Sequence, residues 1–398
     1  MSFNIALSGL NASNQELNTI SNNIANVGTT GFKESRTEFS SVYNGNQAGG
    51  VQVASISQNF DKAGSITGTG RSLDLALTSS GFFVTQDSKG QVAYTRSGIF
   101  NLDSQGTVVS NTGAALQGYT VDANNNLQQG TIGDIQISTA SLPAKATTGV
   151  DFVSNLDSRA DIIDTTVAGY KCDPTDVNSY TNSYTTPVYD SLGNQHTVTQ
   201  YFVKSGENAW GVYTSVNGSD PQPSHFLEFD ESGKLQSEDN YNITFNPPGA
   251  AQMDIRMNVT GMSQYGSDFV VAKNSPDGYA AGDYADLRVE ADGQVFATYS
   301  NGQSLLQGQV VLANFAAPQE LMKTSDTAWT QTYGSGVPTY GTAGAGQFGE
   351  LVSGATEGSN VDLTSELVNL MTAQRNYQAN TKTISTADQL TQALFNVV

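Results

Sequence analysis

The two ends of the chain carry the same hydrophobic periodicity, and no other feature constrains the fold as strongly. Apolar or small residues recur at alternating intervals of four and three residues near both termini. In the N-terminal stripe they are Ala6, Leu10, Ser13, Leu17, Ile20, Ile24 and Val27, and in the C-terminal stripe Leu363, Leu367, Leu370, Gln374, Tyr377, Thr381 and Ile384. Such a repeat follows one side of an α-helix and is typical of coiled-coil seams. The spacing predicts one helix over 1–27 and another over 363–398.

Local signals predict where these helices end and begin. Gly28 follows the first stripe, where a glycine in the left-handed conformation commonly closes a helix. Ser359, with Asp362 three residues later, predicts an N-terminal capping pair for the second helix. Polar residues dilute both stripes, so each helix alone is marginal in water. The pattern leaves two alternatives open: surface helices on a globular domain, or helices that associate with each other and with neighbouring subunits.

The periodicity changes between the two ends. Short segments rich in β-branched and aromatic residues occur at 82–86, 92–96, 200–204, 210–216 and 286–291. Four D-x-x-G sequences separate such segments, and they begin at Asp87, Asp103, Asp190 and Asp230. Aspartate caps the backbone of a turn, while glycine supplies the positive φ that a bulged hairpin needs. The predicted fold class is multidomain, with N- and C-terminal α-helices forming a coiled coil and two mainly antiparallel β domains between them.

Composition shifts along the chain predict the domain boundaries. We expect a helical domain from residues 1–27 and 359–398, followed inward by Gly/Ser/Thr-rich connectors. The connectors cover 28–71 and 334–358, a discontinuous β core covers 72–144 and 277–333, and an inserted β domain covers 145–276.

Charge and cysteine content exclude several classes of protein. Acidic residues outnumber basic ones 37 to 17, and the net charge of -20 disfavours nucleic acid and anionic membranes as partners. No stretch approaches the roughly 20 apolar residues of a membrane span, and the N-terminus lacks the features of a cleaved signal peptide. Cys172 is the only cysteine, so no intrachain disulfide can form.

The motifs of catalysis and metal binding are also missing. There is no G-x-S-x-G elbow, and the two histidines, His196 and His225, have no second ligand at metal spacing. The sequence therefore predicts no catalytic residue, no cofactor and no metal site.

Three separate segments resemble one known family. The segment SNNIANVGTTGFKESR (21–36) is similar to the N-terminal signature of bacterial flagellar rod and hook proteins. The segments 69–85 and 94–119 resemble the core of that family, and 359–394 resembles its C-terminal helix. The large insertion between the two core halves resembles hook rather than rod members. The chain is therefore identified as a member of the flagellar rod and hook axial family, on its hook side.

This resemblance implies a structural role. In the family, the terminal helices line a hollow, curved helical tube, the β core forms the middle layer and the inserted domain forms the outer surface. The tube acts as a flexible universal joint that transmits torque from rod to filament in swimming. The alternatives are a distal flagellar rod protein and a secreted β-rich binding module or hydrolase. A binding module would need an exposed aromatic cluster, for which the candidates are Tyr180, Tyr184, Tyr189, Tyr201 and Trp210.

The resemblance also implies partners and a location. The main partner is the chain itself, in a helical homopolymer, and the others are the distal rod protein, the hook-filament junction protein, the hook cap protein and the flagellar type III export apparatus. The expected location is the extracellular hook, reached without a cleaved signal peptide, with Phe3 and Leu7 resembling an export signal. The expected assembly residues are Leu10, Leu17, Ile20, Ile24, Val27, Leu363, Leu367, Leu370, Tyr377 and Ile384.

Overall fold

A computed structural model describes residues 2–44, 47–122, 125–167 and 169–397. The chain divides into two compact units. The first contains Met1–Thr139, Asp286–Thr298 and Ser304–Val398, and the second contains Ala140–Ala285 and Tyr299–Gln303. Helices at both ends and a mostly antiparallel β-rich middle confirm the coarse fold class predicted from the sequence.

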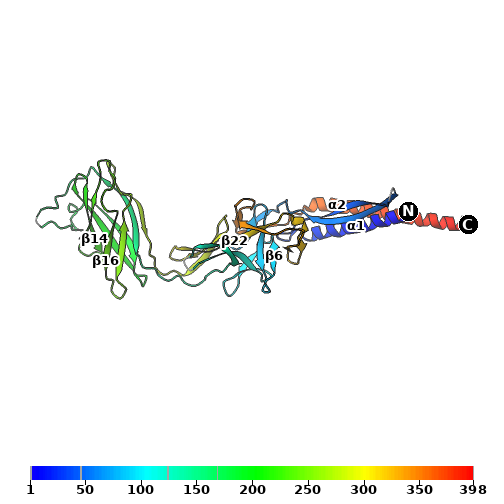
Figure 1. Cartoon of the computed structure of the whole chain (residues 1–398), viewed down its shortest axis with the longest axis horizontal. Coiled ribbons are helices and arrows are strands. Elements are labelled where there is room, and N and C mark those ends of the chain that lie inside the picture. Colours follow the sequence, from blue (N-terminus) through cyan, green and yellow to red (C-terminus); the bar gives the residue numbers. More distant parts are fainter. Residues whose placement is uncertain (1, 45–46, 123–124, 168, 398) are drawn as a thin grey trace. The chain divides into compact units, whose positions relative to one another are not determined.

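Two long helices form one end of the first unit. Helix α1 (Ser2–Ala25) lies beside helix α2 (Leu363–Val397) (Figure 1). The helices are antiparallel, because Gly9 approaches Asn380 near the start of α1 whereas Asn23, near its end, hydrogen-bonds to Glu366. Helix α2 is longer and continues past the start of α1 (Figure 1).

The ends of these helices differ from the predicted caps. Helix α1 ends at Ala25, and the glycine with a positive φ is Gly31 (72°) rather than Gly28, so that prediction was wrong. At the start of α2, Asp362 alone is the N-cap: its Oδ1 accepts the backbone N–H groups of Thr364 (2.9 Å) and Ser365 (3.1 Å). A single carboxylate satisfies both donors, so no partner at residue 359 is needed.

A long hairpin packs against α1. Its strands are β1 (Ser35–Asn44) and β2 (Gln47–Gln58), so the segment expected as a connector over 28–71 contains regular structure. Asn23 of α1 binds both backbone groups of Ser35: its Nδ2 donates to the carbonyl (2.8 Å) and its Oδ1 accepts the N–H (2.9 Å). Thr19 and Thr37 add a hydroxyl–hydroxyl hydrogen bond of 2.9 Å. The helix therefore fixes the first strand through side-chain polar groups.

The rest of the first unit is an antiparallel β core. Its interior includes Phe82, Tyr94, Phe315 and Trp329, whose rings meet edge to face. The strands that lie wholly or mostly in this unit are β3 (Ile66–Gly68), β4 (Leu75–Leu77), β5 (Phe82–Gln86), β6 (Val92–Thr95), β7 (Phe100–Leu102), β8 (Val108–Ser110), β9 (Ala115–Val121), β10 (Leu127–Asp134), β20 (Tyr284–Val289), β21 (Gln294–Tyr299), β22 (Ser304–Asn314), β23 (Met322–Lys323), β24 (Ala328–Thr330), β25 (Thr339–Thr342), β26 (Leu351–Ser353) and β27 (Ala355–Glu357). A short 3-10 helix, Pro318–Glu320, precedes β23.

A buried ion triad lies where the helices meet this core. Glu357 Oε1 is 2.9 Å from Lys33 Nζ, and Glu357 Oε2 is 2.8 Å from an Arg96 guanidinium nitrogen. All three side chains are at most 4% exposed. Burial raises the pKa of the Glu357 carboxyl, but the charges of Arg96 and Lys33 lower it by more, so it stays below its usual value. The two neighbouring cations therefore favour the ionised form of the Glu357 carboxyl, while burial lowers the pKa of Lys33.

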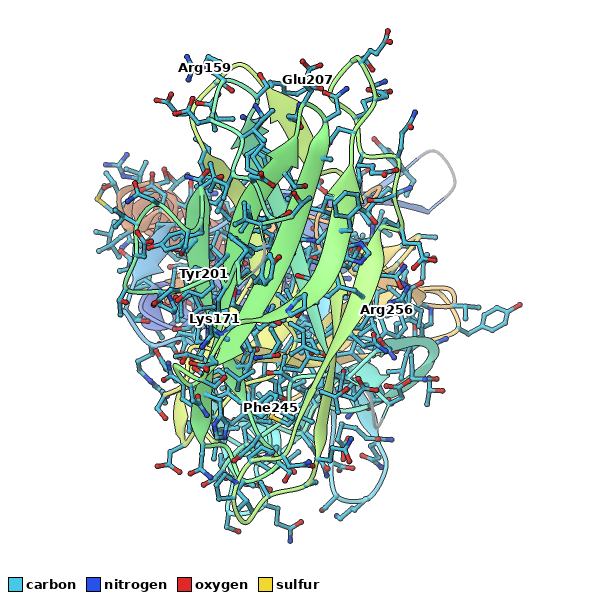
Figure 2. The ribbon with its side chains drawn as sticks, turned by 90° about the vertical axis from the view of Figure 1, so that its left-hand side faces the viewer. Arg159, Lys171, Tyr201, Glu207, Phe245 and Arg256 are labelled. Atoms are coloured by element: carbon cyan, nitrogen blue, oxygen red, sulfur yellow. The ribbon has the colours of Figure 1, made fainter. Side chains whose placement is uncertain are left out.

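The second unit is a β-sandwich. One sheet has the order β16-β17-β11-β18 with β19 also on β11, and the other has the order β12-β13-β14-β15. Aromatic residues of both sheets fill the space between them, including Phe152, Phe202 and the fully buried Trp210. The strands are β11 (Gly149–Asp157), β12 (Asn182–Tyr189), β13 (Gln195–Gly206), β14 (Ala209–Val216), β15 (Gln222–Glu228), β16 (Asn240–Phe245), β17 (Met253–Asn258), β18 (Ser263–Tyr265) and β19 (Val270–Pro276). Figure 2 faces this unit, with Arg159 and Glu207 toward one end of the strands and Phe245 toward the other.

The D-x-x-G turns form as predicted. In each, the aspartate Oδ1 accepts two backbone N–H groups across the turn, as Asp190 does from Leu192 and Asn194 (both 2.9 Å). The glycine adopts a positive φ, which is 85° at Gly193. The other three such glycines, Gly90, Gly106 and Gly233, have φ values of 82°, 81° and 77°.

We predict that Glu357→Gln destabilises the first unit by about 3–5 kcal/mol, because it leaves Lys33 and Arg96 buried without an anion. Urea denaturation followed by circular dichroism measures this change. The matched control is Glu290→Gln, which breaks an exposed 3.0 Å pair with Arg288 and should cost at most about 1 kcal/mol. Equal effects of the two substitutions would contradict a structural role for the triad.

Candidate assembly surface

The face of α2 that packs on α1 is offset from the predicted stripe. The least exposed positions of α2 recur at the same alternating spacing, but they begin at the buried Glu366 and Ala373. The predicted residues Leu370 and Ile384 are half-buried on this face, and Tyr377 lies at its margin. The face therefore runs through Glu366, Leu370, Ala373, Tyr377, Asn380, Ile384 and Ala387.

The first turns of α2 leave apolar side chains in solvent. Leu363 and Leu367 are 43% and 46% exposed, and Val368 and Met371 are each 52% exposed. These four residues are called here the α2 apolar patch. Leu367, Val368 and Met371 lie at least about 100° around the helix from Glu366 and Ala373, whereas Leu363 lies seven residues before Leu370 and is exposed in the first turn. Two predicted assembly residues, Leu363 and Leu367, thus leave nearly half of their side-chain surface in solvent.

The corresponding face of α1 is made of small residues. Ala6, Ala12 and Ser13 are buried, and a side chain at Gly9 would come within 2.9 Å of Asn380. Small residues allow two helices to approach closely, which a stripe of leucines would prevent. Of the larger predicted residues, Leu10 and Leu17 flank this face, whereas Ile20 lies in the same row as Ser13.

The predicted α1 residues differ in exposure. Ile20 is buried, while Leu10, Leu17 and Ile24 are half-buried. Val27 lies beyond the end of the helix and is exposed. The residues proposed for export, Phe3 and Leu7, lie one turn apart on α1 and are both exposed.

A shallow groove of about 400 Å³ lies between α1, α2 and the hairpin. Small residues including Gly9, Ala12 and Ala379 line it, and so do the larger apolar side chains Ile5, Phe39 and Val51. Glu16 is the charged residue in this lining. Partial burial raises the pKa of Glu16, and no cation among the described residues opposes that effect. We call this feature the α1–hairpin groove.

Glu366 is a second acid at the helix pair. Its side chain is 3% exposed, and burial raises its pKa. A hydrogen bond with Asn23 opposes that rise, whereas the negative charge of Glu34 adds to it. A buried carboxylate without a cation makes the α1–α2 contact weaker when it is ionised.

Sequence reasoning missed the residues that hold the helices to the core. Lys33, Arg96 and Glu357 form the triad, and Asn360 accepts the N–H of Glu34 (2.7 Å) while donating to the carbonyls of Asn59 (2.8 Å) and Lys62 (3.0 Å). Lys33, Arg96 and Asn360 lie inside the segments that carry the family resemblance. The sequence signal for these residues was the presence of single polar side chains within segments that match the family.

Other kinds of site find no support in the described part of the chain. Within it, no group of three or more His, Cys, Asp or Glu side chains is placed to hold a metal ion. No described helix is long and apolar enough to span a bilayer. Of the proposed aromatic cluster, Trp210 and Tyr201 are buried, and the Trp210 indole donates to Gln264 (2.7 Å). These two side chains pack in the interior instead of forming a binding face.

Family models match four consecutive parts of the chain. They are the models described as Flagella basal body rod protein (residues 3–33), Flagellar hook protein FlgE/F/G D1 domain (76–149), Flagellar basal body protein FlaE D2 domain (155–279) and Flagellar basal body rod FlgEFG protein C-terminal (352–397).

Known hook proteins are similar over the whole length. The flagellar hook protein FlgE of Salmonella typhimurium is 41% identical over 100% of both chains, and that of Escherichia coli K12 is 40% identical over 100% of both. The Rhizobium meliloti protein is 33% identical over 98% of this chain and 97% of its own. The chain belongs to the flagellar hook protein family.

Members of the flagellar hook protein family are structural proteins of the flagellum, which agrees with the resemblance found in the sequence. The fold agrees as well: the crystal structure of Helicobacter pylori flagellar hook protein FlgE2 matches with a TM-score of 0.55. That match has 14% identity and covers 72% of this chain and 98% of the other. The model for the rod protein ends at Lys33, the first residue of the buried triad.

We predict that Glu366→Gln stabilises the helix pair at neutral pH. The pKa of Glu366 is raised in the folded state, so the unfolded state loses its proton first and stability falls as pH rises above about 4.5. The neutral amide removes that loss, whereas near pH 4 the variant and the parent protein should unfold alike. Thermal unfolding of the helical signal at both pH values measures this. The control Glu350→Gln, at an exposed position, should change neither curve; a stabilisation that is the same at both pH values would contradict the prediction.

Proposed function

We propose that the chain polymerises through α1 and α2 into the hollow, curved tube of the flagellar hook, a flexible joint that transmits torque from rod to filament. The observation that carries this proposal is the α2 apolar patch. Leu363, Leu367, Val368 and Met371 are half-exposed on a helix whose other face already packs on α1. Clustered apolar side chains that one copy leaves in water are a characteristic of interaction surfaces.

The size of the apolar contribution is consistent with assembly. Full burial of one Leu, Val or Met side chain contributes roughly 1.5–3 kcal/mol. The four residues of the patch are only about half exposed, so their burial against a neighbour contributes several kcal/mol for each copy. In a polymer every copy would gain this free energy of burial, which favours continuous contact between subunits. We propose that the contact is a coiled coil in which the helices of neighbouring copies share the burial.

We propose that each domain of the chain forms one layer of the tube. The helical domain of 1–27 and 359–398 lines the inside, with 28–71 and 334–358 connecting it to the core. The core of 72–144 and 277–333 forms the middle layer, and the inserted domain of 145–276 forms the outer surface. The assembly residues proposed from the sequence, Leu10, Leu17, Ile20, Ile24 and Val27 with Leu363, Leu367, Leu370, Tyr377 and Ile384, lie in or beside the two helices.

Further partners follow from this place in the flagellum. We propose that the chain contacts the distal rod protein at one end of the hook and the hook-filament junction protein at the other, and that the hook cap protein guides its assembly. We propose export through the flagellar type III apparatus, with Phe3 and Leu7 in the signal; both side chains are exposed on α1 and accessible to a receptor. The full-length similarity to hook proteins does not favour the distal rod alternative.

We predict that Leu367→Asp abolishes polymerisation of the purified full-length chain without altering its fold. The new charge would have to be buried against a neighbour, whereas in the monomer position 367 already contacts water. Sedimentation and electron microscopy measure polymer, and thermal unfolding followed by circular dichroism measures the monomer. The expected result is loss of sedimenting tubes with an unchanged melting temperature.

The control for this prediction is Leu367→Met, which keeps an apolar side chain of similar volume and should still polymerise. Normal tubes from Leu367→Asp would contradict the proposed role of α2. A matching loss of monomer stability would instead indicate that the helix packs only on its own chain.

A further inference from the structure

Glu16 is the only charged residue of α1, and it lacks a cation. It lines the α1–hairpin groove, and its pKa is raised by partial burial. In the described part of the chain, no ion pair or hydrogen bond of its side chain is found. A partly desolvated carboxylate of this kind is stabilised when a cation approaches it.

Arg375 is the complementary group on α2. It is exposed, and no ion pair engages it in the described structure. Its own chain cannot bring it to Glu16, because Arg375 follows the buried Ala373 by two residues and so lies about 200° around the helix. The guanidinium therefore faces away from α1.

The row that contains Arg375 is suited to the groove. Leu367, Met371 and Arg375 follow one another at intervals of four residues and share one side of α2. They present two exposed apolar side chains followed by one cation. The groove offers apolar side chains at Ile5 and Phe39 together with the Glu16 carboxylate. Apolar character and charge thus match between two surfaces of the same chain that cannot meet within one copy.

The high net negative charge of the chain makes an opposite-charge pair between copies important for assembly. With a net charge of -20, copies of the chain repel one another, and basic residues number only 17. Assembly is favoured when a cation on one copy lies against an acid on the next.

We propose that in the polymer the Leu367–Met371–Arg375 row of one copy docks in the α1–hairpin groove of a second copy, with Arg375 paired to its Glu16. This inference rests on the proposed function, since it names the surface that receives the α2 apolar patch. The occupant is a second copy of this chain.

Charge exchange between the two positions tests the pairing in the full-length chain. Glu16→Arg and Arg375→Glu should each raise the critical concentration for polymerisation by about tenfold or more, the effect expected for a close interfacial charge pair. The double variant should recover most of this loss. An equimolar mixture of the two single variants should form tubes at least as well as either variant alone, because each copy then finds an opposite charge on its neighbour.

The expected result is rescue in the double variant and in the mixture, with all monomers unfolding at the parent temperature. Single variants that polymerise like the parent, or single losses that neither the double variant nor the mixture repairs, would overturn the pairing. Lys382→Glu, which alters the other cation of α2, is the matched control; its rescue by Glu16→Arg to the same extent would also overturn the assignment to Arg375. Failure of the pairing leaves the proposed function intact if Leu367→Asp still abolishes tubes.

Discussion

The buried carboxylate of Glu357 holds together three parts of the chain that are far apart in sequence. Lys33 and Arg96 bind its two oxygens at 2.9 Å and 2.8 Å. Arg96 also donates to the carbonyls of Ser79 (2.7 Å) and Gly81 (2.6 Å), and Lys33 donates to that of Lys62 (2.9 Å). Buried ions are tolerated only when such partners satisfy them. The position of the helices relative to the β core depends on this network of buried ion pairs and hydrogen bonds.

The same network explains why the two terminal helices run antiparallel. The N–H of Gly31 donates to the carbonyl of Glu357 (2.8 Å), so the segments after α1 and before α2 meet at one point. Gly31 has a φ of 72°, and a side chain there would collide with the backbone of Ser97. Going back along the sequence from this point leads into α1, and going forward leads into α2. Two helices anchored a few residues from a shared junction then lie side by side.

Much of the fold was predictable from the sequence because the signals are local. The D-x-x-G turns form as expected, since an aspartate oxygen and a glycine with positive φ are enough to specify them. The β-rich middle and the terminal helices follow from periodicity. By contrast, Leu367 belongs to the predicted stripe but lies off the α1–α2 face, and Leu363 is exposed in the first turn of α2. A spacing of four and three residues predicts a helix, but two adjacent sides of the same helix can both show it. The spacing alone therefore does not identify the side that packs.

What selects the side of α2 that faces α1 is a set of residues that hydrophobicity does not mark. Gly9 admits Asn380 at close range, and Asn23 binds both Glu366 and the backbone of Ser35. These contacts depend on side-chain size and on hydrogen bonds between residues far apart in the sequence, so no local sequence pattern predicts them. The triad was missed for the same reason: Lys33 and Glu357 are separated by 324 positions.

The two sides of α2 therefore differ in what they contact. The face toward α1 combines apolar residues such as Leu370 with small and polar ones, and it contains the buried acid Glu366, whose pKa is raised by burial. The other side carries the α2 apolar patch, whose burial requires a neighbour. Under the proposed function, hydrophobic contact between copies would bury the apolar surface that one copy leaves in water. The triad would then keep each helix pair attached to its own β core while the patch contacts a neighbouring copy.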